Sequence, residues 1–391
     1  MKNSFLEVDY YQISKHGQRA CGDSFFSRKT GERTILVLAD GLGSGIKASV
    51  LSTLTTTMAT AFISSRMDIK RTAEVILETL PVCSYRKIGY STFTIIDALQ
   101  DGQIRIIEHD NPPYVLLRGG EIIRPEKQAI ELSTNRKAQL YFSEFQLEPE
   151  DRLILFSDGI SQAGMGRPGL LLGWLQNGVE SYILELLQNQ PSLSAGQISK
   201  ALAQRARDFD GGKAADDITC AALYLRKPRR TLLVTGPPYK QEHDKVMAEI
   251  VKGFQGIKVI CGGTTSEIIS RELGIPVLVN LKEMRKSMEV PPSADMEGID
   301  LVTEGTITIS RALQLLEEDA NLDSLPDNPV KRLMSILINS DIIDFVVGTK
   351  INDAHQDPAL PKDLEIRRNL IRHLSRVMEE KYYKQTGISF V

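Results

Sequence analysis

The sequence predicts two domains of different fold class, an α+β domain over residues 1–227 and an α/β domain over residues 228–391. A length of 391 residues exceeds what one hydrophobic core usually supports, so two cores are expected. The first part contains many short strand-like segments and few helices, whereas the second alternates strand and helix. These patterns are typical of an antiparallel layered fold and of a parallel sheet, respectively.

A short basic segment separates the two patterns. Residues 226–230 (RKPRR) contain a proline and interrupt the strand and helix pattern. We interpret them as a solvated linker, because five residues are too few for a nucleic-acid-binding patch.

The elements of the first domain are predicted from apolar runs and helical periodicity. Strands are expected at residues 34–39, 92–97, 104–108, 114–118, 152–157 and 218–225, and helices at 46–66, 70–80, 168–188 and 194–208. Because the strands follow one another in meander order with the helices set apart, we expect antiparallel sheets flanked by helices.

The elements of the second domain alternate along the chain. Strands are expected at residues 231–236, 257–263, 276–281, 300–305 and 344–349, and helices at 240–254, 264–274, 309–319, 330–339 and 363–384. This order predicts a Rossmann-like domain, a mostly parallel sheet with helices on both faces.

Composition and cysteine usage narrow the class of protein. Hydrophobic residues make up 42% and charged residues 25% of the chain, which is ordinary for a globular protein. The net charge of -3 gives no electrostatic reason to expect nucleic acid or an anionic membrane as partner. None of the four cysteines forms a C-x-x-C pair, so no zinc ribbon or thioredoxin-type site is expected.

The sequence shows no obvious targeting signal or membrane-spanning segment. A basic region followed by an apolar stretch is missing at the N-terminus, and no run of about 18 apolar residues occurs. Few cysteines in a chain of this size fit a reducing compartment. We therefore expect a cytoplasmic protein.

Acidic residues next to strands are the strongest functional signal. They are Asp23 in CGDSFF, Asp40 in LVLADGLGSG, Asp158 in LILFSDGI, and Asp216 with Asp217 in AADDIT. Asp40 and Asp158 follow the carboxyl end of an apolar strand and Asp216 precedes a strand, so a rigid sheet could hold them at one edge. Carboxylate and carbonyl oxygens are the ligands of hard cations such as Mg²⁺ and Mn²⁺.

Each of these segments also has an ordinary structural explanation. Asp-Gly is a common turn, and aspartate is a common helix N-cap. A dinucleotide site is not favoured, because Ile46 stands where the third glycine of G-x-G-x-x-G would be. Gly41 could offer its backbone carbonyl to a cation, since it has no side chain to block the approach.

Together, five segments in order resemble the PP2C superfamily of metal-dependent protein phosphatases, in its SpoIIE/RsbU-like bacterial branch. The segments are GDSFF, LADGLGSGIKAS, EHDNPPYVLLRGG, LEPEDRLILFSDGISQA and DDITCAALYL. The second is similar to D-G-M-G-x-G-x-x-A and the third to N-A-G-H-x-P-P. The resemblance covers about the first 225 residues.

The resemblance implies a set of site residues. It places metal ligands at Asp40, the Gly41 carbonyl, Asp158 and Asp216, an acid that holds metal-bound water at Asp23, and a supporting acid at Asp217. Asp40, Asp158 and Asp216 would be the catalytic carboxylates.

Several positions depart from the family pattern. Leu42 stands where the eukaryotic branch has a histidine that serves as general acid. Asp110 replaces the histidine of N-A-G-H, and Gln162 replaces the acid of the x-E-A segment. For the phosphate-binding arginine of the eukaryotic enzymes, the candidates are Lys15 and Arg19.

The implied activity is hydrolysis of phosphoserine or phosphothreonine on a bacterial regulatory protein. Two Mn²⁺ or Mg²⁺ ions would bridge a hydroxide that attacks phosphorus in line. No phosphoenzyme is expected, because the hydroxide would attack phosphorus directly. The helices over residues 46–80 would correspond to those that switch the metal site in SpoIIE-like phosphatases, and are equally well explained as core packing.

The second domain has polar loops at three predicted strand ends. The candidate residues are Gly262, Gly263, Thr264 and Thr265, then Glu304, Gly305 and Thr306, and finally Asn352 beside Asp353 and His355. Such loops gather where parallel sheets bind ligands, and free backbone N–H groups attract anions. One hypothesis is a sensor for a phosphorylated or carboxylated small molecule. The other is a docking or dimerisation domain with capped turns, which leaves a homodimer open.

Two other functions compete with the enzyme. A pseudophosphatase would keep the fold and bind without turnover, but the retained Asp40, Asp158 and Asp216 argue against it. A scaffold without catalysis would require the five motifs to be accidental. Another metal-dependent hydrolase remains an alternative, because carboxylate clusters serve many phosphoryl chemistries.

Overall fold

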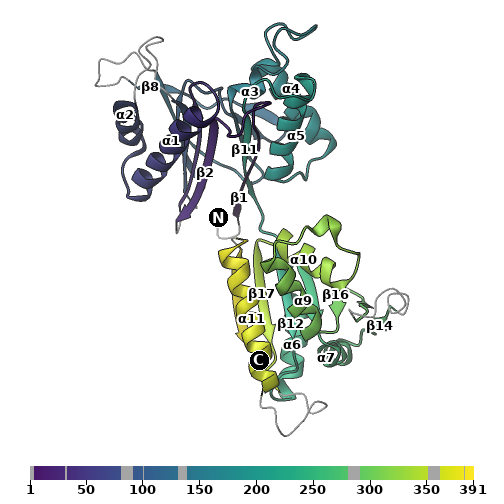
Figure 1. Cartoon of the computed structure of the whole chain (residues 1–391). Helices are drawn as coiled ribbons and strands as arrows, with labels where there is room; N and C mark the ends of the chain where they lie inside the picture. The colour runs from purple at the N-terminus through teal and green to yellow at the C-terminus, as the bar shows by residue number, and fades with distance from the viewer. Residues whose placement is uncertain are drawn as a thin grey trace. The chain divides into compact units, whose positions relative to one another are not determined.

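The computed structural model describes residues 4–30, 33–80, 91–99, 101–130, 139–280, 291–350, 362–382 and 384–391. The chain divides into two compact units, Met1–Lys227 and Pro228–Val391 (Figure 1). Each unit has its own buried apolar clusters.

The first unit contains two antiparallel sheets. One has the order β1 (Phe5–Ile13), β11 (Ile218–Arg226), β10 (Arg152–Phe156), β6 (Val115–Arg118) and β7 (Glu121–Ile123). The other has the order β2 (Asp23–Thr30), β3 (Arg33–Gly41), β4 (Ser91–Leu99), β5 (Gln103–His109), β9 (Leu140–Gln146) and β8 (Gln128–Ile130).

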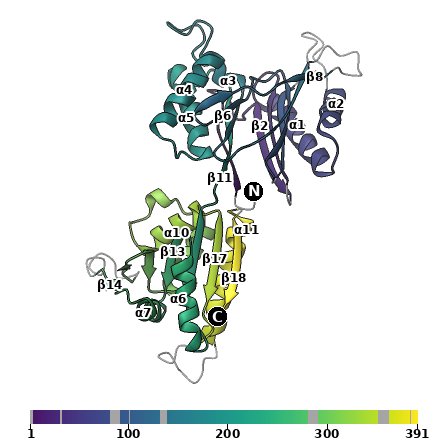
Figure 2. The ribbon, with the colours of Figure 1, turned by 180° about the vertical axis from the view of Figure 1, so that it is seen from behind.

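Helices cover the outer faces of both sheets, giving four layers (Figures 1 and 2). Helices α1 (Ile46–Ser64) and α2 (Ile69–Thr79) pack with the β3–β4–β5 side. Helices α4 (Leu175–Asn189) and α5 (Ala195–Phe209) pack with β10 and β11, and the short α3 (Asp158–Ser161) follows β10. The antiparallel α+β prediction is confirmed.

Strand β3 shows why the layers form. Ile35 and Val37 belong to the cluster shared with α1 and α2, while Leu36 and Leu38 belong to the cluster between the two sheets. Alternate side chains point to opposite faces of a strand, so β3 is buried on both faces. Asp40, near its end, is therefore held by a rigid central strand.

Some elements of the first unit differ from the prediction. Strands β1, β2 and β9 were not predicted, because their half-exposed sequences lack a continuous apolar run. The helix predicted from residue 168 begins at Leu175. Glycines at 164, 166, 169 and 173 have positive φ, which a helix cannot accommodate, so the preceding residues form turns.

Helix α1 is the one helix in the described part of the chain that is long and apolar enough to cross a membrane, judged by length and composition alone. Its Ala59 and Ile63 are fully buried in the core with α2 and β3. Core helices of globular proteins pass the same test.

The second unit has one seven-stranded sheet. Its five parallel strands have the order β16 (Ile299–Thr303), β13 (Ile257–Cys261), β12 (Arg230–Thr235), β17 (Ile342–Val347) and β18 (Gln385–Phe390). Beyond β16, β15 (Ala294–Met296) and β14 (Leu278–Val279) are antiparallel.

Helices pack on both faces of this sheet (Figures 1 and 2). Helices α6 (Glu242–Gly253) and α7 (Gly263–Leu273) cover one face. Helices α9 (Thr306–Glu317), α10 (Pro329–Asn339) and α11 (Lys362–Glu380) cover the other, with a 3-10 turn at Leu322–Ser324. The predicted alternation of strands and helices is thus present.

Two details of the second unit were predicted wrongly. The strand expected at residues 276–281 is the two-residue antiparallel β14. The last helix ends at Glu380, and the chain then forms β18, which was not predicted. Strand β18 lies at the edge of the sheet and is mostly exposed, so its sequence (QTGISF) lacks an apolar run.

Candidate functional site

The predicted acids are brought to one end of the first unit by four segments, namely β2, β3, the start of α3 and the residues before β11. Asp23 starts β2 and lies opposite Asp40 in the β2–β3 register. Asp158 is the first residue of α3, directly after β10, and Asp216 leads into β11. Both sheets thus contribute a carboxylate.

Three of these acids, Asp40, Asp158 and Asp216, line a cavity of about 460 Å³. Its lining consists of Lys15, Asp40, Gly41, Leu42, Gly43, Ser44, Ser91, Thr92, His109, Asp110, Asp158 and Asp216. Asp40, Gly41, Asp158 and Asp216 therefore face one space. Asp23 and Asp217 are buried and do not line it.

Burial and mutual repulsion make the carboxylates hard to ionise together. Burial, followed by Asp23, Asp158 and Asp216, raises the pKa of Asp40 to about 9. Burial, with Asp217 and Asp158 as further causes, raises the pKa of Asp23 to about 7. Burial and Asp216 also raise the pKa of Asp158. A cation among these groups would relieve the repulsion.

The donor set fits a hard divalent cation that keeps part of its water shell. In the described part of the chain, no three His, Cys, Asp or Glu side chains converge as ligands of one ion. Mg²⁺ is commonly held by only one or two carboxylates plus water. One carboxylate oxygen of Asp23, Oδ1, is buried without a hydrogen-bond partner, while Oδ2 accepts from Thr219 Oγ1 at 2.7 Å. An orphaned buried oxygen of this kind is suited to a metal-bound water.

A loop carrying Lys15 lies against the site. The Lys15 N–H donates to Asp217 Oδ1 at 2.9 Å, and its Nζ lies 3.3 Å from Asp216 Oδ1. The next N–H, of His16, donates to the Ala214 carbonyl at 2.9 Å. Among the described residues that line the cavity, Lys15 is the one lysine or arginine; Arg19 is exposed and does not line it.

One departure from the family pattern, Gln162, has a local structural explanation. The Gln162 side-chain amide donates to Asp158 Oδ2 at 2.9 Å. A glutamate there would repel Asp158, whereas the amide supports its negative charge. Leu42 and Asp110 both line the cavity, and Asp110 has a positive φ of 53°.

Sequence reasoning missed polar residues on β4 and β5. His109, the last residue of β5, lines the cavity and is 2% exposed, with Nδ1 3.2 Å from the Gln139 carbonyl. Thr92 also lines it and donates to Asn111 Oδ1 at 2.6 Å. The HDNPP segment contains His109 directly before Asp110, the position that corresponds to the histidine of N-A-G-H.

Alanine at position 41 is expected to destabilise the first unit. A Cβ on Gly41 would lie 2.0 Å from the Ala48 backbone oxygen in α1. Since backbone cannot move aside cheaply, we expect Gly41→Ala to lower the free energy of unfolding by about 2–3 kcal/mol. Urea unfolding checks this. Gly253→Ala, at the end of α6 with open space around it, is the control and should be neutral.

In the second unit, two of the three predicted loops come together. Gly262 and Gly305 are the N-caps of α7 and α9, and a Cβ on Gly305 would lie 3.1 Å from the Gly262 Cα. Glu304 Oε2 accepts the Ile307 N–H at 3.2 Å, so a carboxylate already occupies the start of α9. The third loop follows β17, which β12 separates from β13; Asn352, with Asp353 and His355, lies outside the described residues.

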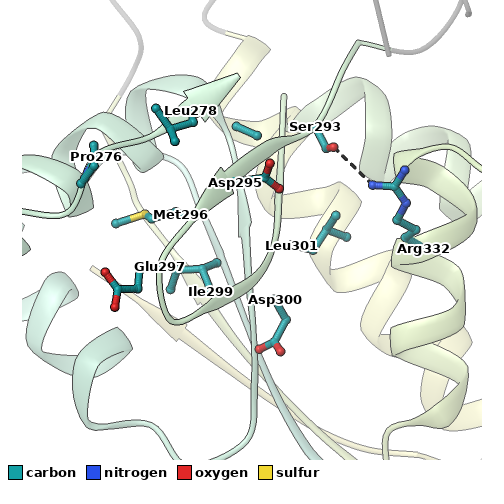
Figure 3. Close-up of a pocket in the computed structure, with 11 residues that line it drawn as sticks. Pro276, Leu278, Ser293, Asp295, Met296, Glu297, Ile299, Asp300, Leu301 and Arg332 are labelled. Atoms are coloured by element: carbon teal, nitrogen blue, oxygen red, sulfur yellow. Dashed lines mark hydrogen bonds between the residues drawn. The ribbon is translucent and has the colours of Figure 1, made fainter. Parts of the chain in front are cut away.

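A cavity of about 400 Å³ lies elsewhere in this unit (Figure 3). It is formed at the antiparallel edge, where Leu278, Met296 and Ile299 contribute apolar side chains. Arg332 Nη1, at its margin, donates to Ser293 Oγ at 3.3 Å. Of the predicted second-domain residues that the structure describes, none lines this cavity.

Comparison with curated proteins finds two relatives from Bacillus subtilis (strain 168). Stage II sporulation protein E is 27% identical over 150 residues, covering 38% of this chain and 18% of that protein. Phosphoserine phosphatase RsbX is 42% identical over 48 residues, covering 12% of this chain and 24% of that protein. The matched segments span less than a quarter of either relative.

Solved structures were compared as well. The phosphatase domain of SpoIIE from Bacillus subtilis has a TM-score of 0.44 at 19% identity, covering 57% of this chain and 94% of that one. RsbX in complex with magnesium has a TM-score of 0.40 at 21% identity, covering 56% of this chain and 95% of that one.

The family model described as stage II sporulation protein E (SpoIIE) matches residues 30–226, about half of the chain. The matched range contains Asp40, Asp158 and Asp216, the acids around the cavity of the first unit. The chain therefore belongs to the SpoIIE family.

Proposed function

We propose that the first unit is a metal-dependent serine/threonine protein phosphatase that acts on a phosphorylated bacterial regulatory protein in the cytoplasm. The observation that carries the proposal is the cavity where Asp40, Asp158 and Asp216 meet beside Lys15. Acids with raised pKa values, a lysine ammonium group and a polar rim around one cavity are typical of an enzyme site. The alternative is a pseudophosphatase that binds without turnover.

We propose Mn²⁺ or Mg²⁺, with two ions, as the cofactor. Asp40, the Gly41 carbonyl, Asp158 and Asp216 would hold the metal, which supplies water activation and neutralises phosphoryl charge. Asp23 would orient water through its buried Oδ1. The overall reaction adds water to the phosphomonoester and releases the serine or threonine hydroxyl and inorganic phosphate.

Other residues of the chain would position the substrate. Asp217 fixes the Lys15 backbone, which leaves the Lys15 ammonium at the cavity wall. We propose that this ammonium contacts a phosphoryl oxygen of the bound substrate. Gln162 keeps Asp158 oriented through its hydrogen bond.

Replacement of Lys15 tests this role. Lys15→Met removes the charge and should raise KM for a phosphoserine peptide about tenfold, since a charge-assisted hydrogen bond contributes about 1.5–3 kcal/mol. Lys15→Arg keeps the charge and should recover most of the affinity. Steady-state kinetics with saturating metal separate KM from kcat. Equal kinetics in wild type and Lys15→Met would contradict the assignment.

The activity itself is tested with p-nitrophenyl phosphate and a phosphoserine peptide. The rate is measured with Mn²⁺, with Mg²⁺ and with EDTA. Metal-dependent release of phosphate from the peptide supports a protein phosphatase. Peptide binding without phosphate release under every metal condition would favour the pseudophosphatase.

For the second unit, we propose a Rossmann-like ligand-sensing domain that regulates the phosphatase, with a docking or dimerisation role as the alternative. The adjacent glycine-capped starts of α7 and α9 support a ligand, although Glu304 occupies one of them. Thermal unfolding of the full chain with inorganic phosphate, a sugar phosphate or a dicarboxylate tests this. No increase in Tm with any of them would favour the docking role.

A further inference from the structure

The loop between α3 and α4, together with the first residue of α4, presents large aliphatic side chains to solvent. The exposed fractions are 56% for Met165, 75% for Leu171, 71% for Leu172 and 48% for Leu175. Four such side chains within eleven residues form a concentrated apolar surface. Clustered exposed apolar residues mark interaction sites, whereas single ones are common on any surface.

The loop is ordered by its own hydrogen bonds. Arg167 and Leu170 form a bridge, and the Gly173 N–H donates to the Leu170 carbonyl at 2.9 Å. Trp174, at the end of the loop, is 7% exposed and packs edge-on against Phe209. These contacts hold the loop in a defined conformation in which its leucines are exposed to solvent.

Two connections tie the loop to the proposed catalytic site. A Cβ on Gly173 would lie 2.8 Å from the Gln162 Cα, so the loop packs on the residue that hydrogen-bonds Asp158. Asp210 accepts the Gly164 N–H at 2.7 Å through Oδ1 and the Ala215 N–H at 2.8 Å through Oδ2. Since Ala215 precedes Asp216, this buried carboxylate joins the loop to a second site segment.

We infer that residues 164–175 form the docking surface for the phosphorylated protein substrate and bind apolar side chains that flank its phosphorylated residue. The inference rests on the proposed phosphatase function. The loop is continuous with the segments that carry Asp158 and Asp216, so a substrate bound at those acids would also reach the loop. An anionic lipid surface is disfavoured, because the one basic residue of the loop, Arg167, donates through its guanidinium to the Asp210 carbonyl.

The test compares wild type with the double variant Leu171→Ser/Leu172→Ser. Both side chains are exposed, so folding should be unaffected. The substrates are p-nitrophenyl phosphate and two phosphoserine peptides that differ only in leucine or serine flanking the phosphoserine. In wild type, kcat/KM should favour the leucine-flanked peptide about tenfold, as partial burial of one or two leucines allows. In the variant this preference should disappear, while p-nitrophenyl phosphate hydrolysis changes less than about twofold.

Leu278→Ser, at an equally exposed leucine of the second unit, is the matched control and should keep the peptide preference. Fluorescence polarisation with a non-hydrolysable phosphonate version of each peptide measures docking without turnover. Failure of the phosphatase proposal would therefore show as missing hydrolysis with leucine-dependent binding intact. Equal binding and turnover of the two peptides by wild type would overturn the docking surface. So would a double variant that retains the preference, or one whose sedimentation shows that these leucines hold two copies of the chain together.

Discussion

Asp40→Asn is expected to lower kcat/KM for p-nitrophenyl phosphate by about 10³-fold and at the same time to stabilise the metal-free protein. Asp40 lies among Asp23, Asp158 and Asp216, and burial with these neighbours raises its pKa to about 9. Asparagine keeps the shape but removes one negative charge. The activity falls because a metal ligand is lost. The metal-free folded state becomes more stable because a repulsion between carboxylates is lost.

The stability gain has a defined pH dependence. A carboxyl whose pKa is raised by folding destabilises the fold as pH rises from its unfolded value toward its folded value. Asp40→Asn should therefore raise the Tm of the EDTA-treated protein by roughly 3–6 °C at about pH 8, and by little near pH 4.

A matched variant separates the metal role from a general effect on the cavity. Asp110→Asn makes the same change at another lining residue that is not a proposed ligand. It should retain activity within about fivefold of wild type. A similar loss of activity in both variants would mean that Asp40 does not act as a specific metal ligand.

Removal of the metal should lower the activity about as much as Asp40→Asn does. EDTA is expected to lower the turnover number about 10³-fold or more, and excess Mn²⁺ or Mg²⁺ should restore it. Protons compete with the metal, because burial and neighbouring acids raise the pKa of Asp23 to about 7 and that of Asp40 to about 9. If one proton leaves Asp40 per bound ion, apparent metal affinity should rise about tenfold per pH unit from roughly pH 5 up to the Asp40 pKa of about 9.

Two measurements check this prediction. Metal titrations of the initial rate at several pH values give the apparent affinity, and differential scanning calorimetry gives the metal-induced change in Tm. The Tm increment should grow with pH, since the metal-free fold loses stability as the carboxyls ionise. If neither the apparent metal affinity nor the metal-induced increase in Tm changed with pH, the metal would bind away from these acids.

The carboxylates at strand ends could be predicted from sequence because their signals are local. Asp40 follows an apolar run of five residues, 35–39, and Asp158 follows Ser157 and an apolar run of four residues, 153–156. Both runs are long enough to define a buried strand. The direction of such a strand then places the acid at the sheet edge. Five ordered motifs further indicated the family.

The surroundings of Asp23 could not be predicted in this way. Its strand, β2, ends in exposed charged residues and has no continuous apolar pattern. Asp23 Oδ2 accepts a hydrogen bond from Thr219, 196 residues away in the chain, while its Oδ1 has no hydrogen-bond partner among the described residues. Contacts over such distances depend on how the two sheets pack, which periodicity does not encode.

The second unit shows a similar division between local and distant information. The alternation of strands and helices correctly predicted its parallel core. It did not predict that β12 separates β17 from β13, so the three polar loops were expected in one crevice. Strand order depends on the packing of the helices on both faces and has no signature within a single strand.

The account is tested most directly by phosphate release from a phosphoserine peptide, measured with Mn²⁺ or EDTA for wild type and Asp216→Asn. Asp216 lines the cavity and leads into β11, which belongs to a different sheet from the β3 strand that carries Asp40. The account predicts manganese-dependent release by wild type and its loss in Asp216→Asn, with both proteins folded. Release that is unaffected by EDTA, or equal in the two proteins, would contradict it.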